Sequence, residues 1–173
     1  MFESVNLIIK SDGEHKTRIA GNCLGRCLTP GTTVLLCGDL GAGKTTFTKA
    51  LAEGVGIDPR HVTSPTFSIL HHFPEGKIPL VHVDLYRLGE NPDLDEIGID
   101  EYLDGHHIMV VEWSEYLRDE SPLKYKSILI RLTFESETVR LLEFTFPDEL
   151  LNVKACLKKC LEEQGIEYES VGA

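Results

Sequence analysis

The sequence predicts an α/β fold, with a mixed β-sheet flanked by helices in a single domain that carries β-hairpins. Two continuous apolar runs, at 32–37 and 107–113, are typical of strands buried on both faces of a sheet. The first run leads through a glycine-rich turn directly into a helical pattern, as in α/β proteins. The chain of 173 residues has no internal repeat or linker-like stretch, so we expect one domain, 1–173.

The first third of the chain alternates strands and helices. We expect an edge strand at 6–10, a helix at about 15–28, a central strand at 32–37 and a helix at 44–55. The Pro30-Gly31 turn ends the first helix, and glycines at 54 and 56 end the second.

Two hairpins, a strand and helical segments follow. In chain order they are a hairpin from 66–73 and 79–86, an acidic helical stretch at 93–104, a strand at 107–113 with a short helix after it, and a second hairpin near the sheet edge from 127–136 and 138–147. An amphipathic helix at about 148–164 ends the pattern. We expect its Leu/Cys stripe to pack on the core, with contact to a partner protein as the alternative.

Acidic residues dominate the charge of the chain. The 28 Asp and Glu against 17 Lys and Arg give a formal net charge of −11, and a surface of this sign repels a phosphate backbone. If the protein serves nucleic-acid chemistry, we expect a partner to hold the nucleic acid. No apolar run is long enough to cross a bilayer, and MFESVNLIIK lacks the pattern of a secretion signal, so we expect a cytoplasmic protein without a membrane contact.

Four of the five cysteines form two pairs with helical spacing. Cys23 and Cys27 are four residues apart, as are Cys156 and Cys160, so each pair can share one face of its helix. We expect small reduced thiols, buried or half-buried, as is usual in the cytosol. A zinc site built from both pairs is the alternative, although it requires two distant helices and lacks the short C-x-x-C loops of structural zinc.

The histidines raise the question of a metal site. The pairs His71-His72 and His106-His107 are interpreted as polar residues at strand ends, with a metal-ligand role as the alternative. His82 alternates with Asp84 on one strand face, which brings it near the candidate site described below. We expect a buried histidine with satisfied hydrogen bonds.

A phosphate-binding loop is the strongest functional signal. Residues 38–45 read GDLGAGKT and match G-x-x-x-x-G-K-[ST] in full, between a predicted strand and a predicted helix, as in a P-loop NTPase-like domain. The glycines let successive N–H groups surround phosphates, and the helix directs the positive end of its dipole at the same anion. Lys44 can reach the β- and γ-phosphates, and the Thr45 hydroxyl can complete a magnesium shell. The expected nucleotide-binding residues are Gly38, Asp39, Leu40, Gly41, Ala42, Gly43, Lys44, Thr45 and Thr46.

Two carboxylates follow predicted central strands. Asp84 comes after LVHV and Glu112 after IMVV, and a magnesium nucleotide site requires a carboxylate at the end of a neighbouring strand. One acid would hold the metal, directly or through water, and the other would orient the attacking water or complete the outer shell of the metal; the sequence leaves open which acid has which role. The candidate catalytic residues are Lys44, Asp84 and Glu112, and the candidate Mg²⁺ ligands are Thr45, Asp84 and Glu112.

Hydroxyl side chains surround a proline between the loop and these acids. They belong to Thr63, Ser64 and Thr66 in the segment VTSPTF. The segment fits a loop that senses the γ-phosphate, through Ser64 and Thr66, and becomes ordered when it is present. An ordinary polar turn is the alternative.

The rest of the sequence favours ATP hydrolysis over other nucleotide chemistries. A GTP switch would need the guanine-specifying N-K-x-D, which is absent, and DEIG at 95–98 only mimics a switch element because it follows no buried strand. A small-molecule kinase would close an arginine-rich lid, whereas Arg87 is followed by an acidic stretch. A motor or transporter ATPase would be larger. The remaining possibility is a compact ATPase whose hydrolysis of ATP is used by a partner protein, with a phosphotransferase or an ATP-sensing scaffold as alternatives.

Four motifs together resemble those of the TsaE family. They are GDLGAGKTTF (38–47), SPTF (64–67), H-x-DLYRL (82–88) and VEW (111–113), and the similarity covers roughly residues 5–145. DLYR and EW are not general features of P-loop enzymes, so the set is more specific than the loop alone. The family comprises the small ATPases of bacterial tRNA threonylcarbamoyladenosine synthesis.

This resemblance implies a P-loop α/β fold and magnesium-dependent ATP hydrolysis, weak in the isolated chain. It also implies two larger partners of the TsaB and TsaD type, which modify adenosine 37 of tRNAs that read codons beginning with A. Contact with tRNA would then be indirect, through these partners.

The resemblance also implies roles for individual residues. Lys44 and Thr45 would bind phosphate and magnesium. Asp84 and Glu112 would serve the metal and hydrolysis, and Trp113 would flank the site. In addition, residues 64–66 would form the γ-phosphate-sensing loop, and residues around 11–17 would help to hold the adenine.

Overall fold

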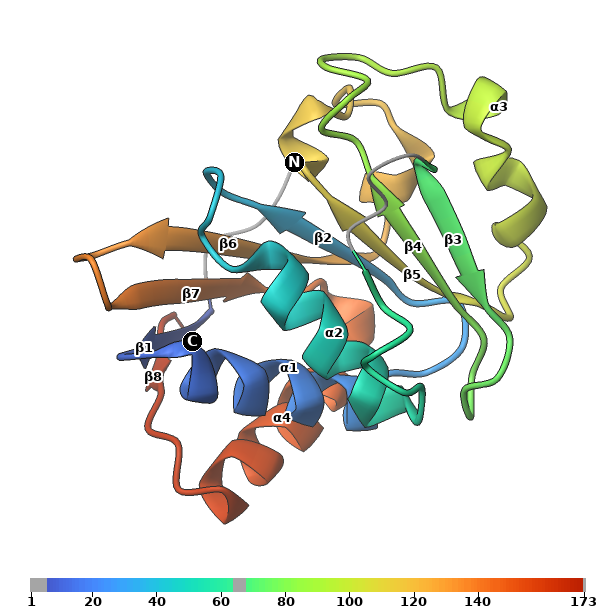
Figure 1. Ribbon diagram of the computed structural model, residues 1–173. Helices are drawn as coiled ribbons and strands as arrows, with labels where there is room; N and C mark the ends of the chain where they lie inside the picture. Colours follow the sequence, from blue (N-terminus) through green and yellow to red (C-terminus); the bar gives the residue numbers. More distant parts are fainter. Residues whose placement is uncertain (1–5, 64–67, 173) are drawn as a thin grey trace.

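The computed structural model describes residues 6–63 and 68–172, which form one mixed β-sheet with helical segments on both faces (Figure 1). The strands are β1 (Leu7–Ser11), β2 (Thr33–Cys37), β3 (Leu70–Phe73), β4 (Leu80–Asp84), β5 (Ile108–Glu112), β6 (Ser127–Phe134), β7 (Arg140–Thr145) and β8 (Glu169–Ser170). Their order in the sheet is β3-β4-β5-β2-β6-β7-β1-β8.

Each α-helix overlaps a segment that the sequence predicts to be helical, whereas the sequence does not predict the 3-10 helix at Pro122–Lys124. The α-helices are α1 (Glu14–Cys27), α2 (Lys44–Val55), α3 (Leu94–Ile97) and α4 (Leu151–Glu163). Shorter 3-10 helices are η1 (Ile99–Tyr102), η2 (Ser114–Tyr116), η3 (Pro122–Lys124) and η4 (Asp148–Leu150). Within the two described ranges, no helix combines the length and the apolar character that crossing a bilayer requires.

The centre of the sheet is parallel. β4, β5, β2 and β6 run in one direction, and Asp84 of β4 is aligned with Glu112 of β5. Antiparallel strands extend both sides, with β3 on β4 and with β7, β1 and β8 beyond β6. The carboxyl ends of β2, β4 and β5 therefore meet at one edge, which brings the phosphate loop and both predicted acids together.

The predicted strands and both hairpins are confirmed, except that the strand expected at 66–73 begins only at Leu70, and residues 66 and 67 lie outside the described ranges. Two expected positions in the sheet are wrong. The strand expected at an edge, β1, has a neighbour on each side, β7 and β8. β8 has two residues, too few to show a period in the sequence. The hairpin expected near the edge, β6–β7, lies inside the sheet, because β6 pairs with β2 and β7 with β1.

Residues along the central strands alternate between two hydrophobic cores. On β2, Val34 and Leu36 face the larger core, which α1, α2 and α4 cover, while Leu35 faces a smaller core on the other side. The smaller core is completed by side chains from α3, η1 and η3. In α4, Leu157 and Leu161 are buried in the larger core, so the predicted packing of its apolar stripe is confirmed.

α1 lies directly on α2 because glycines remove side chains from the contact. A Cβ on Gly25 would lie 2.1 Å from the carbonyl oxygen of Leu51, and one on Gly54 would lie 2.3 Å from that of Asn22. The two backbones therefore touch, as only glycine permits. Since α2 begins at Lys44, this contact holds the helix that follows the phosphate loop.

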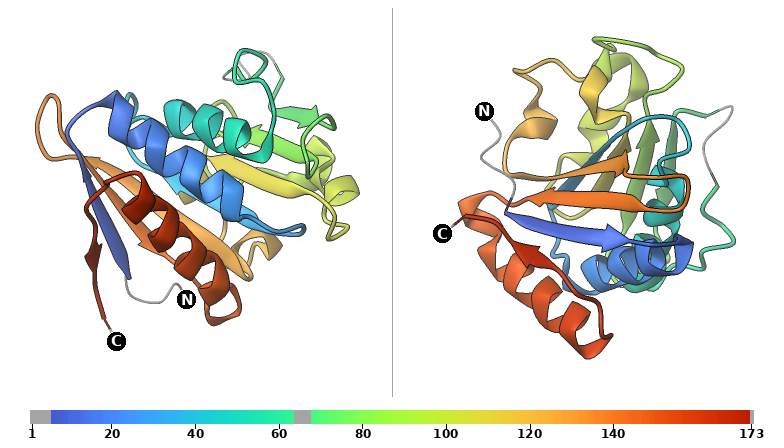
Figure 2. Two further views of the ribbon diagram at one scale, coloured as in Figure 1. Left: turned by 90° about the horizontal axis from the view of Figure 1, so that it is seen from below. Right: turned by 90° about the vertical axis from the view of Figure 1, so that its left-hand side faces the viewer.

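Two disulfide bonds join α1 to α4, so the expectation of reduced thiols is wrong. Cys23 is bonded to Cys160 and Cys27 to Cys156, with Cα–Cα distances of 5.6 and 5.7 Å, and Cys37 is free. The zinc alternative is not supported, because these thiols pair with one another. The spacing in the sequence shows that two cysteines share a face of each helix, but it does not show that α1 and α4 lie side by side (Figure 2). Closing a loop of this length stabilises a fold by about 5 kcal/mol in the chain-entropy model.

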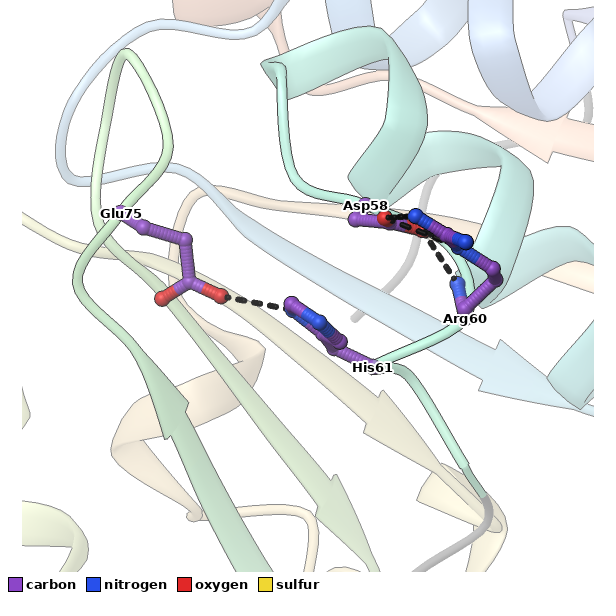
Figure 3. A network of polar contacts seen from close by, with 4 residues as sticks. All are labelled: Asp58, Arg60, His61 and Glu75. Carbon is purple, nitrogen blue, oxygen red and sulfur yellow. Dashed lines mark hydrogen bonds and ion pairs between the residues drawn. The ribbon is translucent and has the colours of Figure 1, made fainter.

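Polar contacts hold the segment that leaves α2. Asp58 accepts hydrogen bonds from the guanidinium and the backbone N–H of Arg60, and these keep the pKa of the carboxyl well below its usual range. His61 Nδ1 lies 3.6 Å from Glu75 Oε1 in the β3–β4 turn (Figure 3). Exposed ion pairs add little stability, so we infer that this network mainly directs the chain from α2 toward β3.

Candidate nucleotide-binding site

The loop between β2 and α2 has a backbone conformation that requires glycine. Gly38 has a φ of 140°, and a Cβ there would lie 2.2 Å from the carbonyl oxygen of Leu132. Gly43 has a φ of 106° and caps the N-terminus of α2. The N–H groups of the first helical turn, which have no partner within the helix, therefore border the loop and form an anion-binding concavity.

Lys44 holds its ammonium group against this loop. Its Nζ donates hydrogen bonds to the carbonyl oxygens of Gly38 and Asp39, the second at 2.9 Å, and lies 3.8 Å from the centre of the Trp113 ring. Burial lowers the pKa of Lys44, and the carboxylates around it, Glu115 foremost, only partly oppose this change. The lysine therefore stands at the loop within reach of a bound phosphate group.

Glu112, at the end of β5, is a buried carboxylate surrounded by hydrogen-bonding partners. Its Oε2 accepts a hydrogen bond from Thr45 Oγ1 at 2.9 Å. Its Oε1 accepts one from Thr48 Oγ1 at 3.1 Å and lies 2.9 Å from His82 Nε2. Burial alone would raise the pKa of Glu112, but the contacts with His82, Thr45 and Thr48 outweigh it, so the pKa is lowered and the carboxylate stays ionised.

Asp84 lies beside Glu112 on the neighbouring strand. Its Oδ1 accepts a hydrogen bond from the backbone N–H of Tyr86 at 3.0 Å. Both acids and the loop border one pocket of about 270 Å³, lined by Leu40, Gly41, Gly43, Lys44, Thr45, Thr46, Asp84, Tyr86, Glu112 and Trp113. The structure therefore brings together the loop, the two strand-end acids and the tryptophan that the sequence singles out.

Aromatic rings form one wall of this pocket. The Trp113 ring lies 4.8 Å from that of Tyr86 and 5.6 Å from that of Tyr116, between ring centres. Trp113 has a φ of 61°, a left-handed conformation that costs energy for a residue with a Cβ. The indole lies against Lys44 in this conformation, so the strained residue contributes directly to the pocket.

A second pocket of about 360 Å³ adjoins the other side of the loop. It is lined by Asp12, Gly13, Glu14, Thr17, Gly41, Ala42, Gly43, Thr46, Thr138 and Arg140. The N-terminal segment that the resemblance associates with adenine thus reaches the loop. A larger hollow of about 590 Å³, lined by residues from 92–94 and 117–122, shares no residue with the loop, so size alone does not identify the site.

The other predicted residues have mixed outcomes. Ser64 and Thr66 lie outside the described residues. Asp39 and Leu40 are exposed on the loop. His82 is completely buried beside the site, but its Nδ1 has no hydrogen-bond partner within the described ranges, so the expectation of a fully satisfied histidine is wrong.

The paired histidines show no metal site. The His72 and His107 rings lie 5.1 Å apart between centres, and His107 Nδ1 lies 2.9 Å from Asp104 Oδ1. Across residues 6–63 and 68–172, no three His, Cys, Asp or Glu side chains are arranged to hold a metal ion. The metal-ligand alternative therefore has no support in the described structure.

Sequence reasoning missed Thr48, Tyr86 and Glu115. Thr48 lies one helical turn after Lys44, and that spacing could have indicated it. Tyr86 lies within the DLYR motif quoted above. Glu115 accepts a hydrogen bond from the N–H of Gly38 at 3.2 Å, across a separation of 77 residues that leaves no local pattern.

Comparisons with known proteins identify a family. The family model described as "Threonylcarbamoyl adenosine biosynthesis protein TsaE" matches residues 11–142. The tRNA threonylcarbamoyladenosine biosynthesis protein TsaE of Bacillus subtilis is 43% identical over 108 residues, which cover 62% of this chain and 66% of that protein, slightly less than two thirds. Its namesake from Nostoc is 40% identical over 148 residues, covering 83% of this chain and 88% of that protein. The crystal structure of YdiB from Bacillus subtilis has a TM-score of 0.72 at 28% identity, covering 94% of this chain and 99% of that one.

Proposed function

The chain belongs to the TsaE family, and from that membership we propose that it acts in tRNA threonylcarbamoyladenosine biosynthesis as a magnesium-dependent ATPase. Residues 38–46 bind the phosphates of ATP, and water is the acceptor of the γ-phosphoryl group. The free energy of hydrolysis then serves partner proteins instead of phosphorylating a substrate.

The hydrogen bond between Thr45 and Glu112 is the observation that supports this proposal most directly. In P-loop NTPases, the hydroxyl that follows the loop lysine and an acid on a neighbouring strand hold the magnesium of a bound nucleotide. Thr45 Oγ1 and Glu112 Oε2 are 2.9 Å apart, and Asp84 is aligned with Glu112 on the next strand. A phosphate loop alone binds an anion, whereas these oxygen atoms equip it for a magnesium nucleotide.

The donor atoms fit magnesium. One hydroxyl and two carboxylates offer only oxygen, the donor that Mg²⁺ prefers, and Mg²⁺ typically keeps its other positions for water and phosphate. Few protein ligands are therefore needed. We propose that Thr45 and Glu112 hold the ion, which when bound neutralises negative charge on the phosphate oxygens.

The remaining residues divide the other tasks. Lys44 exchanges its carbonyl partners for β- and γ-phosphate oxygens, and its charge stabilises the charge that develops during phosphoryl transfer. Asp84 is less buried than Glu112 and lies beside it, so it orients the attacking water. The rings of Tyr86 and Trp113 limit the entry of bulk water from one side.

We propose that partners of the TsaB and TsaD type carry out the transfer to tRNA, in the cytoplasm. The net charge of −11 supports an indirect contact with tRNA. We expect slow hydrolysis by the isolated chain, because Lys44 must first give up its two carbonyl contacts, and partner binding can offset that cost.

ATP turnover with and without the two partner proteins, together with nucleoside analysis of tRNA, tests the proposal. We expect slow turnover by the chain alone, faster turnover with the partners, dependence on Mg²⁺, and loss of threonylcarbamoyladenosine in a strain that lacks the chain. The proposal would be contradicted if the rate of ATP turnover did not change when the partners were added and the deletion strain kept a normal level of threonylcarbamoyladenosine.

The same experiment separates the alternatives. Stoichiometric transfer of phosphate from ATP to a defined acceptor, detected by mass spectrometry, would favour a phosphotransferase. Binding of magnesium ATP without turnover, even with the partners present, would favour an ATP-sensing scaffold.

A further inference from the structure

The two disulfide bonds between α1 and α4 differ in exposure. Cys23, Cys27 and Cys160 are 2%, 7% and 9% exposed, whereas Cys156 lies on the exposed side of α4. Both residues of the Cys23–Cys160 bond are thus mostly buried, although Cys23 borders a hollow of about 190 Å³, whereas the Cys27–Cys156 bond has one exposed residue. Because thiol–disulfide exchange requires an approach to one sulfur atom, the second bond is the reactive one.

Either bond alone is enough to hold α4 on α1. Cys23–Cys160 spans 137 residues, so it restricts the unfolded chain strongly. Once it is formed, Cys27 and Cys156 are each only one helical turn away from it. The second bond then closes a short ring and removes little further chain entropy. Opening Cys27–Cys156 therefore leaves α4 attached to α1.

We propose that Cys156 is a site of reversible modification by small thiols of the glutathione type, with Cys27 as the cysteine that resolves the adduct. A thiolate RS⁻ attacks Sγ of Cys156, the bond to Cys27 breaks, and Cys27 leaves as a thiolate. A second RS⁻ attacks the R sulfur of this mixed disulfide, RSSR forms, and Cys156 leaves as a thiolate. In total, two RSH are oxidised to RSSR and one protein disulfide is reduced to two thiols; RSSR drives the reverse reaction.

The surroundings of Cys156 suit an anionic thiol. Lys159 is exposed three residues further along α4, hence on the same side of the helix. Positive charge favours the approach of a thiolate and of the carboxylates of glutathione. Cys156 lies beyond the residues matched by the family model, 11–142, and its chemistry does not depend on the proposed ATPase.

Timed reduction of the purified full-length chain by reduced glutathione tests which of the two disulfide bonds opens first. After quenching by alkylation, peptide mapping should show Cys27 and Cys156 labelled about tenfold or more faster than Cys23 and Cys160. Cys37 is 4% exposed, so it serves as an internal control that stays unlabelled in the folded chain. Equal rates for the two bonds, or a purified protein with free thiols and one bound zinc, would overturn the proposal.

Two matched variants test the adduct itself. Cys27→Ser and Cys23→Ser each retain one disulfide and leave one cysteine of α4 without its partner. With oxidised glutathione, Cys27→Ser should gain one glutathione at Cys156, whereas Cys23→Ser should remain unmodified at the buried Cys160. Circular dichroism checks that both variants are folded. The reduction experiment above uses the native chain, so its result does not depend on the folding of either variant. Equal uptake by the two folded variants would overturn the proposal.

Discussion

His82 Nε2 and Glu112 Oε1 lie 2.9 Å apart on neighbouring strands, beneath a phosphate loop to which neither residue belongs. Both side chains are buried, and the Nδ1 atom of His82 has no hydrogen-bond partner among the described residues. A buried histidine with this one polar contact contributes chiefly by fixing the carboxylate. Such support is typical of groups that orient metal ligands.

Substitution of His82 tests this role. His82→Leu leaves Glu112 Oε1 with Thr48 as its remaining donor, and we expect kcat for ATP to fall about tenfold or more, with a smaller change in KM. His82→Gln keeps an N–H donor and should recover much of the loss. If the loss of turnover in each variant is fully explained by a lower unfolding temperature, His82 has only a structural role.

Lys44 is expected to be essential for turnover but not for folding. Lys44→Met should lower ATP turnover by about a hundredfold or more, because it removes a charge that stabilises the transferred phosphoryl group. Its unfolding temperature should not fall, since a buried ammonium group is replaced by an apolar chain of similar length. Lys49→Met on the same helix is the control and should retain turnover. Normal turnover in Lys44→Met would refute the assignment.

The direct contact between α1 and α2 predicts a large effect at Gly25. Gly25→Ala places a Cβ 2.1 Å from the carbonyl oxygen of Leu51, so the helices must separate. We expect the free energy of unfolding, measured in urea, to fall by ~3 kcal/mol or more. Gly13→Ala is the control for added volume, because nothing lies within 4 Å of its Cβ; since Gly13 is the N-cap of α1, we expect a loss of about 1 kcal/mol or less there. Similar losses in both variants would show that the contact is not tight.

Cys37 makes stability depend on alkaline pH. Burial raises the pKa of its thiol from 9.0 to about 11. The folded state therefore binds this proton more tightly, so the contribution is complete below pH 9.0 and is lost as the pH rises to about 11. Over this window, the free energy of unfolding should fall by up to ~3 kcal/mol more in the native chain than in Cys37→Ala. Parallel curves from urea unfolding would contradict this.

The sequence predicts those parts of the site that local residues mark. Lys44 and Thr45 belong to a continuous pattern, and Asp84 and Glu112 each follow a buried run. Their meeting follows from a general rule, since the carboxyl ends of neighbouring parallel strands share one edge. Glu115 has no such mark, because its contact with the loop depends on how the chain turns after β5.

The disulfides show the same limit for the fold. Helical spacing reveals each cysteine pair, but the bonds depend on the pairing of β1 with β7. α1 follows β1 in the chain and α4 comes after β7, so this antiparallel pair of strands brings the two helices together. The sequence alone does not reveal the pairing of β1 with β7, and for this reason α1 and α4 are expected to be distant.

The Cys23–Cys160 bond also determines where a mechanical load travels. Tension between the two ends of the chain passes from α1 to α4 through this bond and bypasses the peptide backbone of residues 24–159. Every residue proposed to bind phosphate or magnesium lies inside the bypassed segment. The covalent path between the two ends of the chain therefore avoids the phosphate loop and both acids, whereas the segment around residues 11–17 lies on that path.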